Sequence, residues 1–242
     1  MKDRTIASLG NRIALLSMLA MASLAMPAHA DRIKLPAYQI DLKQTSVSGL
    51  SSGAFMAAQF QVAYSSIMTG AGIVAGGPFY CSGNYPLQSY VGSAMTTCMN
   101  PGLLWPKPDA AASLASAKIF EKAGQIDKVA NLKKQKVYLF SGKSDKTVTT
   151  DVVNQTASFY QLAGVPAENI KYVTNIDAGH AITTSNKQNQ DCPITAPPYI
   201  NDCDITQSQE ILSYIYGPLN APATTLSGTI IEVDQQEFAP SA

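Results

Sequence analysis

Hydrophobic and polar positions along the chain predict strands that alternate with helices. Residues 38–48 alternate loosely between apolar and polar side chains, which predicts a strand. Residues 49–53 are small and predict a tight turn, and residues 54–66, with no Gly or Pro and many good helix formers, predict a helix. The alternation continues, with strands expected at 71–75, 136–141, 170–175 and 229–233 and helices at 109–123, 152–163 and 206–216.

This order of elements predicts the fold class. Strands that alternate with helices form a mostly parallel sheet with helices on both faces, so we expect an α/β fold. Two segments break the alternation and are expected to be irregular. Residues 80–108 hold two cysteines, Trp105 and four prolines, and residues 184–204 are rich in Pro, Asn and Asp.

The first 30 residues have the pattern of a secretory signal peptide. A basic start precedes an apolar run, residues 13–26, and Ala28 and Ala30 then lie at the two positions that a signal peptidase recognises. The run is about 14 residues long, whereas a membrane-spanning helix needs about 20. No later stretch is long enough to span a membrane. We therefore expect residues 1–30 to be removed and residues 31–242 to form one domain, secreted to the medium or the periplasm.

The charge balance excludes some classes of partner. The chain carries 17 Lys and Arg against 17 Asp and Glu, without a basic patch or a block of like charge. Nucleic acid and membrane are therefore not expected as partners. An uncharged or weakly charged substrate fits this composition better.

The four cysteines predict two disulfides, because an even number in an exported chain is typical of cross-linking. Three pairings are possible, and the local one, Cys81 with Cys98 and Cys192 with Cys203, is favoured. A zinc site is the alternative. The chain has no C-x-x-C spacing and one histidine after residue 30, so no metal is expected.

A G-x-S-x-G pattern, residues 49–53, lies between the first predicted strand and the first predicted helix. In that context the pattern indicates a nucleophile turn with Ser51 exposed at the start of the helix. The N–H of Ser52 is then the expected donor to a developing oxyanion. The alternative is a turn of small residues that only lets the helix pack close to the sheet.

His180 is the candidate base, since a serine hydroxyl is a poor nucleophile without one. It is the one imidazole after residue 30, and it follows the strand predicted at 170–175. A structural histidine with both ring nitrogens satisfied is the alternative. The order serine, acid, histidine along the chain favours the catalytic interpretation.

Asp145 is the candidate acid that would orient the base. It lies in the loop directly after the strand predicted at 136–141, where this fold places its acid. Asp177 is the rival. Because it is three residues from His180, it is more typical of a loop-forming residue.

Beyond these single residues, four longer segments stand out: SVSGLSSGAFMAAQFQVAYS, GGPFYC, YLFSGKSDKTV and DAGHA. Together they resemble the secreted poly(3-hydroxybutyrate) depolymerases, in the branch whose α/β-hydrolase fold is circularly permuted. The resemblance covers nearly all of residues 31–242. It implies Ser51 as nucleophile, Asp145 as acid and His180 as base of an exported polyester hydrolase.

The resemblance also implies a permuted and incomplete domain. A standard hydrolase places several strands before the nucleophile turn, whereas residues 31–50 leave room for one. Permuted relatives continue past a segment like GTIIEVDQQEF into further strands, where a histidine-glycine-cysteine motif supplies a second oxyanion donor. This chain lacks that motif and stops at Ala242. We therefore expect a catalytic domain truncated at its C-terminus, with a companion chain as one way to complete the sheet.

The leading hypothesis is hydrolysis of poly(3-hydroxybutyrate) or a related hydroxyalkanoate polymer or oligomer through an acyl-enzyme, without a cofactor. A carbohydrate esterase that releases acetyl or feruloyl groups is one alternative, and an inactive fragment that only binds polymer is another. Phe79, Tyr80 and Trp105 are candidates for the substrate cleft, since aromatic side chains suit an apolar polyester. Packing in the core is the alternative role for each.

Overall fold

The computed structural model describes residue 34, residues 37–235 and residue 238. Within this part, residues 40–222 form one compact unit that contains all the helices and strands named below. The predicted signal peptide, residues 1–30, lies outside the described residues. No helix among those described is long and apolar enough to cross a bilayer.

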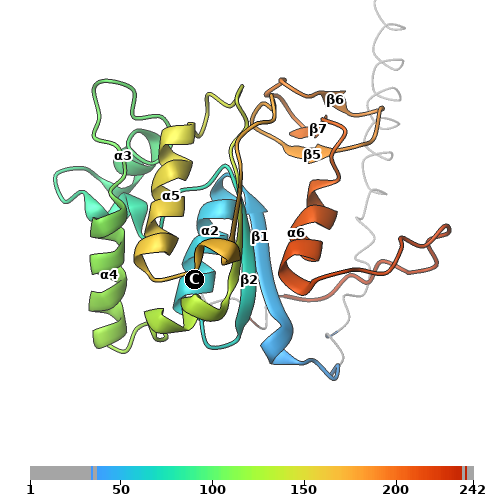
Figure 1. Cartoon of the computed structure of the whole chain (residues 1–242), viewed down its shortest axis with the longest axis horizontal. Coiled ribbons are helices and arrows are strands. Elements are labelled where there is room, and N and C mark those ends of the chain that lie inside the picture. The colour runs from blue at the N-terminus through green and yellow to red at the C-terminus, as the bar shows by residue number, and fades with distance from the viewer. Residues whose placement is uncertain (1–33, 35–36, 236–237, 239–242) are drawn as a thin grey trace, which may run out of the picture. The chain divides into compact units, whose positions relative to one another are not determined.

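Four parallel strands form the main sheet (Figure 1). They are β1 (Thr45–Leu50), β2 (Met68–Val74), β3 (Lys136–Phe140) and β4 (Ile170–Val173), in the spatial order β1-β2-β3-β4. β1 is therefore an edge strand of the sheet that the described residues form.

The four strands end level with one another. Leu50 pairs with Val74, Val74 with Phe140, and Phe140 with Val173, and each is the last residue of its strand. The loops that follow the strands therefore all leave from one edge. In α/β sheets this carboxyl edge is where ligands bind.

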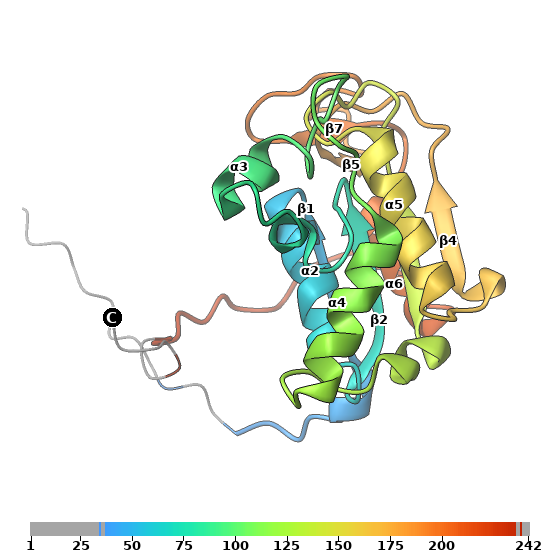
Figure 2. The ribbon, with the colours of Figure 1, turned by 90° about the vertical axis from the view of Figure 1, so that its left-hand side faces the viewer.

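Helices cover both faces of the sheet. α2 (Ser52–Ala63), α4 (Ala110–Lys122) and α5 (Thr150–Leu162) cover one face, with α4 beside α5 (Figure 2). α6 (Gln207–Tyr216) packs on the other face against β2 and β3. This arrangement confirms the α/β class predicted from the alternation of strands and helices.

β3 shows how the sequence pattern divides the core. Val137 and Leu139 point into the larger core, which α2, α4 and α5 complete, whereas Tyr138 and Phe140 point toward Ile211 on α6. All four strand residues are at most 1% exposed. A strand buried on both faces has a continuous apolar sequence rather than an alternating one, and KVYLF has that character.

A second, smaller sheet lies in the segment that was expected to be irregular. β5 (Ile182–Thr184), β6 (Gln190–Asp191) and β7 (Ile200–Asp202) pair in parallel in the order β5-β7-β6. The expectation of a loop at 184–204 was wrong in this respect. Strands of two or three residues are too short to leave a periodic pattern.

The expectations for residues 38–48 and 80–108 also need correction. The strand expected at 38–48 begins only at Thr45, because η1 (Leu42–Gln44) precedes it and the Asp41 carboxylate accepts the N–H of Lys43. The segment 80–108 contains η2 (Cys81–Asn84) and α3 (Tyr90–Met95).

The strand expected at 229–233 is absent from the described residues. Only Val233 there has a bridge contact, and Ile230 is 98% exposed. A β-propensity without a pairing partner does not make a strand.

Candidate active site

The turn around Ser51 is strained in the way a nucleophile turn requires. Ser51 has φ 56° and ψ −123°, a conformation that residues other than glycine rarely adopt. Its N–H donates to the carbonyl of Val74 at 3.0 Å, so it lies at the carboxyl edge between β1 and α2. A Cβ on Gly49 would lie 2.3 Å from the carbonyl carbon of Gly53, so only glycine fits at position 49. At Gly53 itself a Cβ would meet nothing within 4 Å.

Ser51 immediately precedes the first turn of α2, which begins at Ser52. N–H groups in the first turn of a helix have no acceptor within the helix, and the helix dipole places partial positive charge there. The Ser52 N–H therefore has the chemistry that an oxyanion needs.

Asp145 and His180 are in direct contact. The ring Nδ1 of His180 lies 2.8 Å from Oδ2 of Asp145, and the two side chains are 7% and 1% exposed. The other carboxylate oxygen, Oδ1, accepts the N–H groups of Thr147 at 2.8 Å and Val148 at 3.0 Å. Three hydrogen bonds thus fix the carboxylate. An N–H on Nδ1 leaves the lone pair of Nε2 to accept a proton.

The loops that carry the acid and the base are joined through their backbones. Lys143 N–H donates to the carbonyl of Ile176 at 2.9 Å, and Ser144 N–H donates to that of Ala178 at 3.1 Å. Asp177, the rival acid, accepts the Ser144 hydroxyl at 2.5 Å rather than an N–H of the imidazole. These contacts join the loop after β4, which carries His180, to the loop after β3, which carries Asp145. Because β3 is nearer to β1 than β4 is, they hold the base toward the side of the sheet that carries Ser51.

The three candidate residues therefore share the carboxyl edge of one sheet. Asp145 and His180 form a hydrogen bond, while the hydrogen bonds of the described residues include none between Ser51 and His180. Hydrogen bonds between a base and its nucleophile are often long in a free enzyme and tighten when substrate binds.

A largely apolar cavity of about 470 Å³ opens beside Ser51. α2 and the segment that the Cys81–Cys98 disulfide closes contribute its walls. Its lining residues are Ser51, Ser52, Phe55, Met56, Gln59, Tyr80, Cys81, Ser82, Ala94, Met95, Cys98 and Met99. A cavity with these walls suits an uncharged, flexible organic chain.

The cleft candidates have three different environments. Tyr80 lines the cavity, and its hydroxyl lies 3.0 Å from that of Tyr90. This hydrogen bond, together with burial, raises the pKa of Tyr80, which keeps the phenol neutral. Phe79 is 4% exposed and packs against Phe120 and Phe159 in the core, and Trp105 is 45% exposed and is not among the cavity residues.

Sequence inspection missed most of the cavity. Phe55, Met56 and Gln59 could have been found, since they lie on the first two turns of the helix that follows the nucleophile. Met95 and Met99 had no local signal, because the Cys81–Cys98 cross-link brings their segment to the serine.

Both disulfides follow the local pairing that the sequence favours, Cys81–Cys98 and Cys192–Cys203. Among the described residues there is no group of three or more His, Cys, Asp or Glu side chains that could hold a metal ion.

Comparison with known proteins identifies polyhydroxybutyrate depolymerases as relatives. No protein-family model matches the chain. It is 40% identical over 222 residues to a poly(3-hydroxybutyrate) depolymerase of Delftia acidovorans, covering 90% of this chain and 43% of that protein. It is 38% identical over 229 residues to a polyhydroxybutyrate depolymerase of Talaromyces funiculosus, covering 93% of this chain and 61% of that protein. The chain thus spans between about two fifths and three fifths of these relatives' lengths.

Solved structures give the same result for the fold. The crystal structure of the PHB depolymerase from Penicillium funiculosum matches with a TM-score of 0.73 and 37% identity, covering 84% of this chain and 61% of that one. A serine-to-alanine variant of a PHB depolymerase in complex with an R3HB trimer matches with a TM-score of 0.73 and 36% identity over the same shares. The fold is therefore α/β-hydrolase-like, and most of the chain is similar to PHB depolymerases.

Proposed function

We propose that this chain is a serine esterase that hydrolyses poly(3-hydroxybutyrate) or a related hydroxyalkanoate polyester or oligomer. The observation that carries the proposal is the buried Asp145–His180 hydrogen bond, at the same sheet edge as the strained Ser51. A carboxylate that holds an imidazole at the same sheet edge as a serine is the arrangement that activates a hydroxyl nucleophile.

In the first half of the proposed reaction, Ser51 Oγ attacks the ester carbonyl carbon while His180 Nε2 takes the hydroxyl proton. The carbonyl oxygen becomes an oxyanion, which the Ser52 N–H at the start of α2 stabilises. Asp145 keeps Nδ1–H oriented and stabilises the imidazolium. The tetrahedral intermediate then collapses, the alcohol end of the polymer leaves with the proton from His180, and the acyl group stays on Ser51.

In the second half, a water molecule attacks the acyl-Ser51 ester, and His180 takes one proton from that water. Collapse of this second intermediate breaks the bond to Ser51 Oγ, which recovers its proton from His180. The product is a free carboxylic acid. Water supplies the atoms, and the residues end as they began.

Three observations support a polyester substrate. The relatives are PHB depolymerases, and one related structure holds an R3HB trimer. The cavity at Ser51 is lined mainly by apolar side chains. Leu103, Leu104 and Trp105 are 103%, 90% and 45% exposed, and exposed apolar side chains in a cluster are typical of contact with an apolar surface.

Export is part of the proposal, because a polymer granule outside the cell can be reached only by an exported enzyme. Two disulfides and no free cysteine among the described residues are typical of an oxidising compartment.

The test compares Ser51→Ala with Ser48→Ala, which removes an exposed hydroxyl from β1, the strand before the nucleophile turn. We expect Ser51→Ala to lower the release of 3-hydroxybutyrate from a polymer film by about 10⁵- to 10⁶-fold and to abolish labelling by a fluorophosphonate probe. Ser48→Ala should retain both. Turnover of acetylated xylan without turnover of the film would support a carbohydrate esterase instead, and a folded wild-type chain that the probe does not label would refute the esterase.

A further inference from the structure

The main chain of the base, and not only its ring, is held by a separate loop. His180 N–H donates to the hydroxyl oxygen of Thr195 at 2.8 Å, and the preceding N–H, of Gly179, donates to the carbonyl of Cys192 at 2.8 Å. Both acceptors belong to the segment that the Cys192–Cys203 disulfide closes. Asp145 therefore orients the imidazole, while this loop fixes the backbone from which the imidazole extends.

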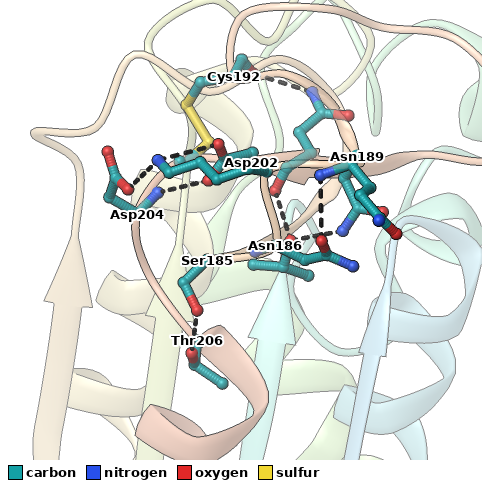
Figure 3. Close-up of polar contacts among 12 residues, drawn as sticks. Ser185, Asn186, Asn189, Cys192, Asp202, Asp204 and Thr206 are labelled. Carbon is teal, nitrogen blue, oxygen red and sulfur yellow. Dashed lines mark hydrogen bonds and ion pairs between the residues drawn. A yellow bond between two sulfur atoms is a disulfide. The ribbon is translucent and has the colours of Figure 1, made fainter.

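Asn201, on β7, fixes the loop in turn. Its side-chain amide donates to the carbonyl of Cys192 at 2.9 Å and to that of Ile194 at 2.6 Å, and the residue is fully buried. Figure 3 shows the disulfide and the polar contacts around it. An amide NH₂ has two protons, and Asn201 uses both on this turn. The Cys192 carbonyl thus accepts from both Asn201 and Gly179.

The side-chain amide of Asn201 is held in one orientation. Among the described residues, its Oδ1 is buried without a hydrogen-bond partner, although buried acceptors are usually satisfied. Turning the amide over would place Oδ1 against two carbonyl oxygens, and only the Cys192 carbonyl would keep another donor, the Gly179 N–H. The two carbonyl acceptors therefore fix the orientation of the buried Asn201 amide.

Steric contact reinforces the hydrogen bonds. A Cβ on Gly179 would lie 2.2 Å from the carbonyl oxygen of Ile194 and 2.6 Å from that of Pro193. The turn after Cys192 therefore lies directly against the backbone beside His180, and the glycine permits that close approach. A shift of the turn would be transmitted to the base.

We propose that Thr195 and Asn201 are positioning residues for His180. The proposal rests on the proposed function, because it assigns these residues to the base of that reaction. An error of about 1 Å in the placement of a catalytic group can cost about 100-fold in rate. The loop would supply this precision from outside the three catalytic residues.

The test is a pair of substitutions at the exposed Thr195. Thr195→Val keeps the shape but removes the oxygen that accepts the His180 N–H, and Thr195→Ser keeps the oxygen. We expect Thr195→Val to lower kcat on a soluble 3-hydroxybutyrate oligomer by about tenfold with KM within about twofold, because the base is displaced while the binding cavity is untouched. Thr195→Ser should restore kcat to near the wild-type value.

A second measurement does not depend on activity. Backbone hydrogen exchange of the His180 amide should be about tenfold faster in Thr195→Val than in wild type or Thr195→Ser, because an N–H that loses its acceptor exchanges more readily. Ser185→Ala is the control, since the Ser185 hydroxyl, directly after β5, bonds to that of Thr206, directly before α6, and to no group of the base (Figure 3).

The outcomes separate the two proposals. A wild-type kcat in Thr195→Val, an equal loss in Thr195→Ser, or an equal loss in Ser185→Ala would each refute positioning while the esterase stands. If the wild-type chain hydrolyses no ester, the proposed function fails. The exchange rates then decide alone whether the loop holds His180, and an unchanged rate in Thr195→Val would show that it does not.

Discussion

Two disulfide-closed segments contact the candidate site, and they differ in character. The Cys81–Cys98 bond spans 17 residues and closes a segment that gives Ala94 and Met95 to the cavity beside Ser51. The Cys192–Cys203 bond spans 11 residues and closes a segment that holds the backbone of the base by hydrogen bonds. The first segment meets the site through apolar side chains, and the second through hydrogen bonds.

The difference matches two separate requirements of the proposed reaction, which are binding of an apolar substrate and orientation of the base. An apolar chain needs no directional partner, and methionine side chains adapt to irregular apolar shapes. A base must hold its lone pair in one direction, and only directional contacts fix a backbone in this way. The same kind of cross-link therefore supports an adaptable wall in one segment and a fixed frame in the other.

Removal of each disulfide in turn should give the largest contrast. The two loops are similar in length, so each bond should contribute about 3 kcal/mol to stability, and the two double variants should be about equally destabilised. Cys192→Ser with Cys203→Ser should lower kcat by about 10- to 100-fold with little change in KM, because the base loses its frame. Cys81→Ser with Cys98→Ser should instead raise KM several-fold.

Steady-state kinetics on a soluble oligomer, at a temperature where near-ultraviolet circular dichroism shows both variants folded, measure this contrast. Equal losses of kcat in the two double variants would mean that the segments differ only in composition and not in function.

A smaller effect is expected from the apolar wall itself. Met95→Ala should raise KM for a 3-hydroxybutyrate oligomer about fivefold and leave kcat unchanged, since it removes roughly 1 kcal/mol of apolar contact with bound substrate. Ile119→Ala on α4 is the matched control, because Ile119 is 64% exposed, Met95 is 63% exposed, and Ile119 is not among the cavity residues. A fall in kcat at constant KM would place Met95 with the chemistry instead of the binding.

The order of elements and the three candidate catalytic residues follow from local signals. Continuous apolar runs such as KVYLF identify buried strands, and G-x-S-x-G between a strand and a helix identifies the turn at Ser51. Asp145 and His180 follow from their places after strands. Parallel strands whose ends lie level bring such residues to one edge, so sequence order alone nearly determines the arrangement.

The supporting residues could not be predicted, because distant contacts position them. Thr195 accepts a backbone N–H 15 residues earlier, and Asn201 donates to carbonyls 9 and 7 residues earlier from β7, a strand too short to leave a pattern. Phe79 and Tyr80 are adjacent in sequence and equally aromatic. Phe79 nevertheless packs in the core, whereas Tyr80 lines the cavity. The left-handed backbone of Tyr80, φ 55°, helps to point the two rings in different directions, and no local sequence pattern predicts that angle.

The smallest effect should come from substitution of Trp105. This substitution tests whether the apolar surface that contacts the polymer extends beyond the cavity beside Ser51. Trp105 is partly exposed beside two fully exposed leucines, and it is not a cavity residue. Trp105→Ala should weaken adsorption to a polymer film about threefold. A flat surface covers only one side of the indole ring, so the ring should contribute well under ~1 kcal/mol more binding free energy than an alanine side chain.

Turnover of a soluble oligomer should not change in Trp105→Ala, and Leu162→Ala, an exposed apolar residue at the end of α5, should change neither quantity. The measurements are the film-bound fraction of protein and kcat/KM on the oligomer. If both quantities fall together, Trp105 contacts the polyester chain that reacts. The substrate site is then one continuous cleft that includes Trp105, rather than a cavity with a separate adsorbing surface. If only adsorption falls, attachment to the polymer surface and substrate binding in the cavity beside Ser51 are separate functions. Each can then be altered without changing the other.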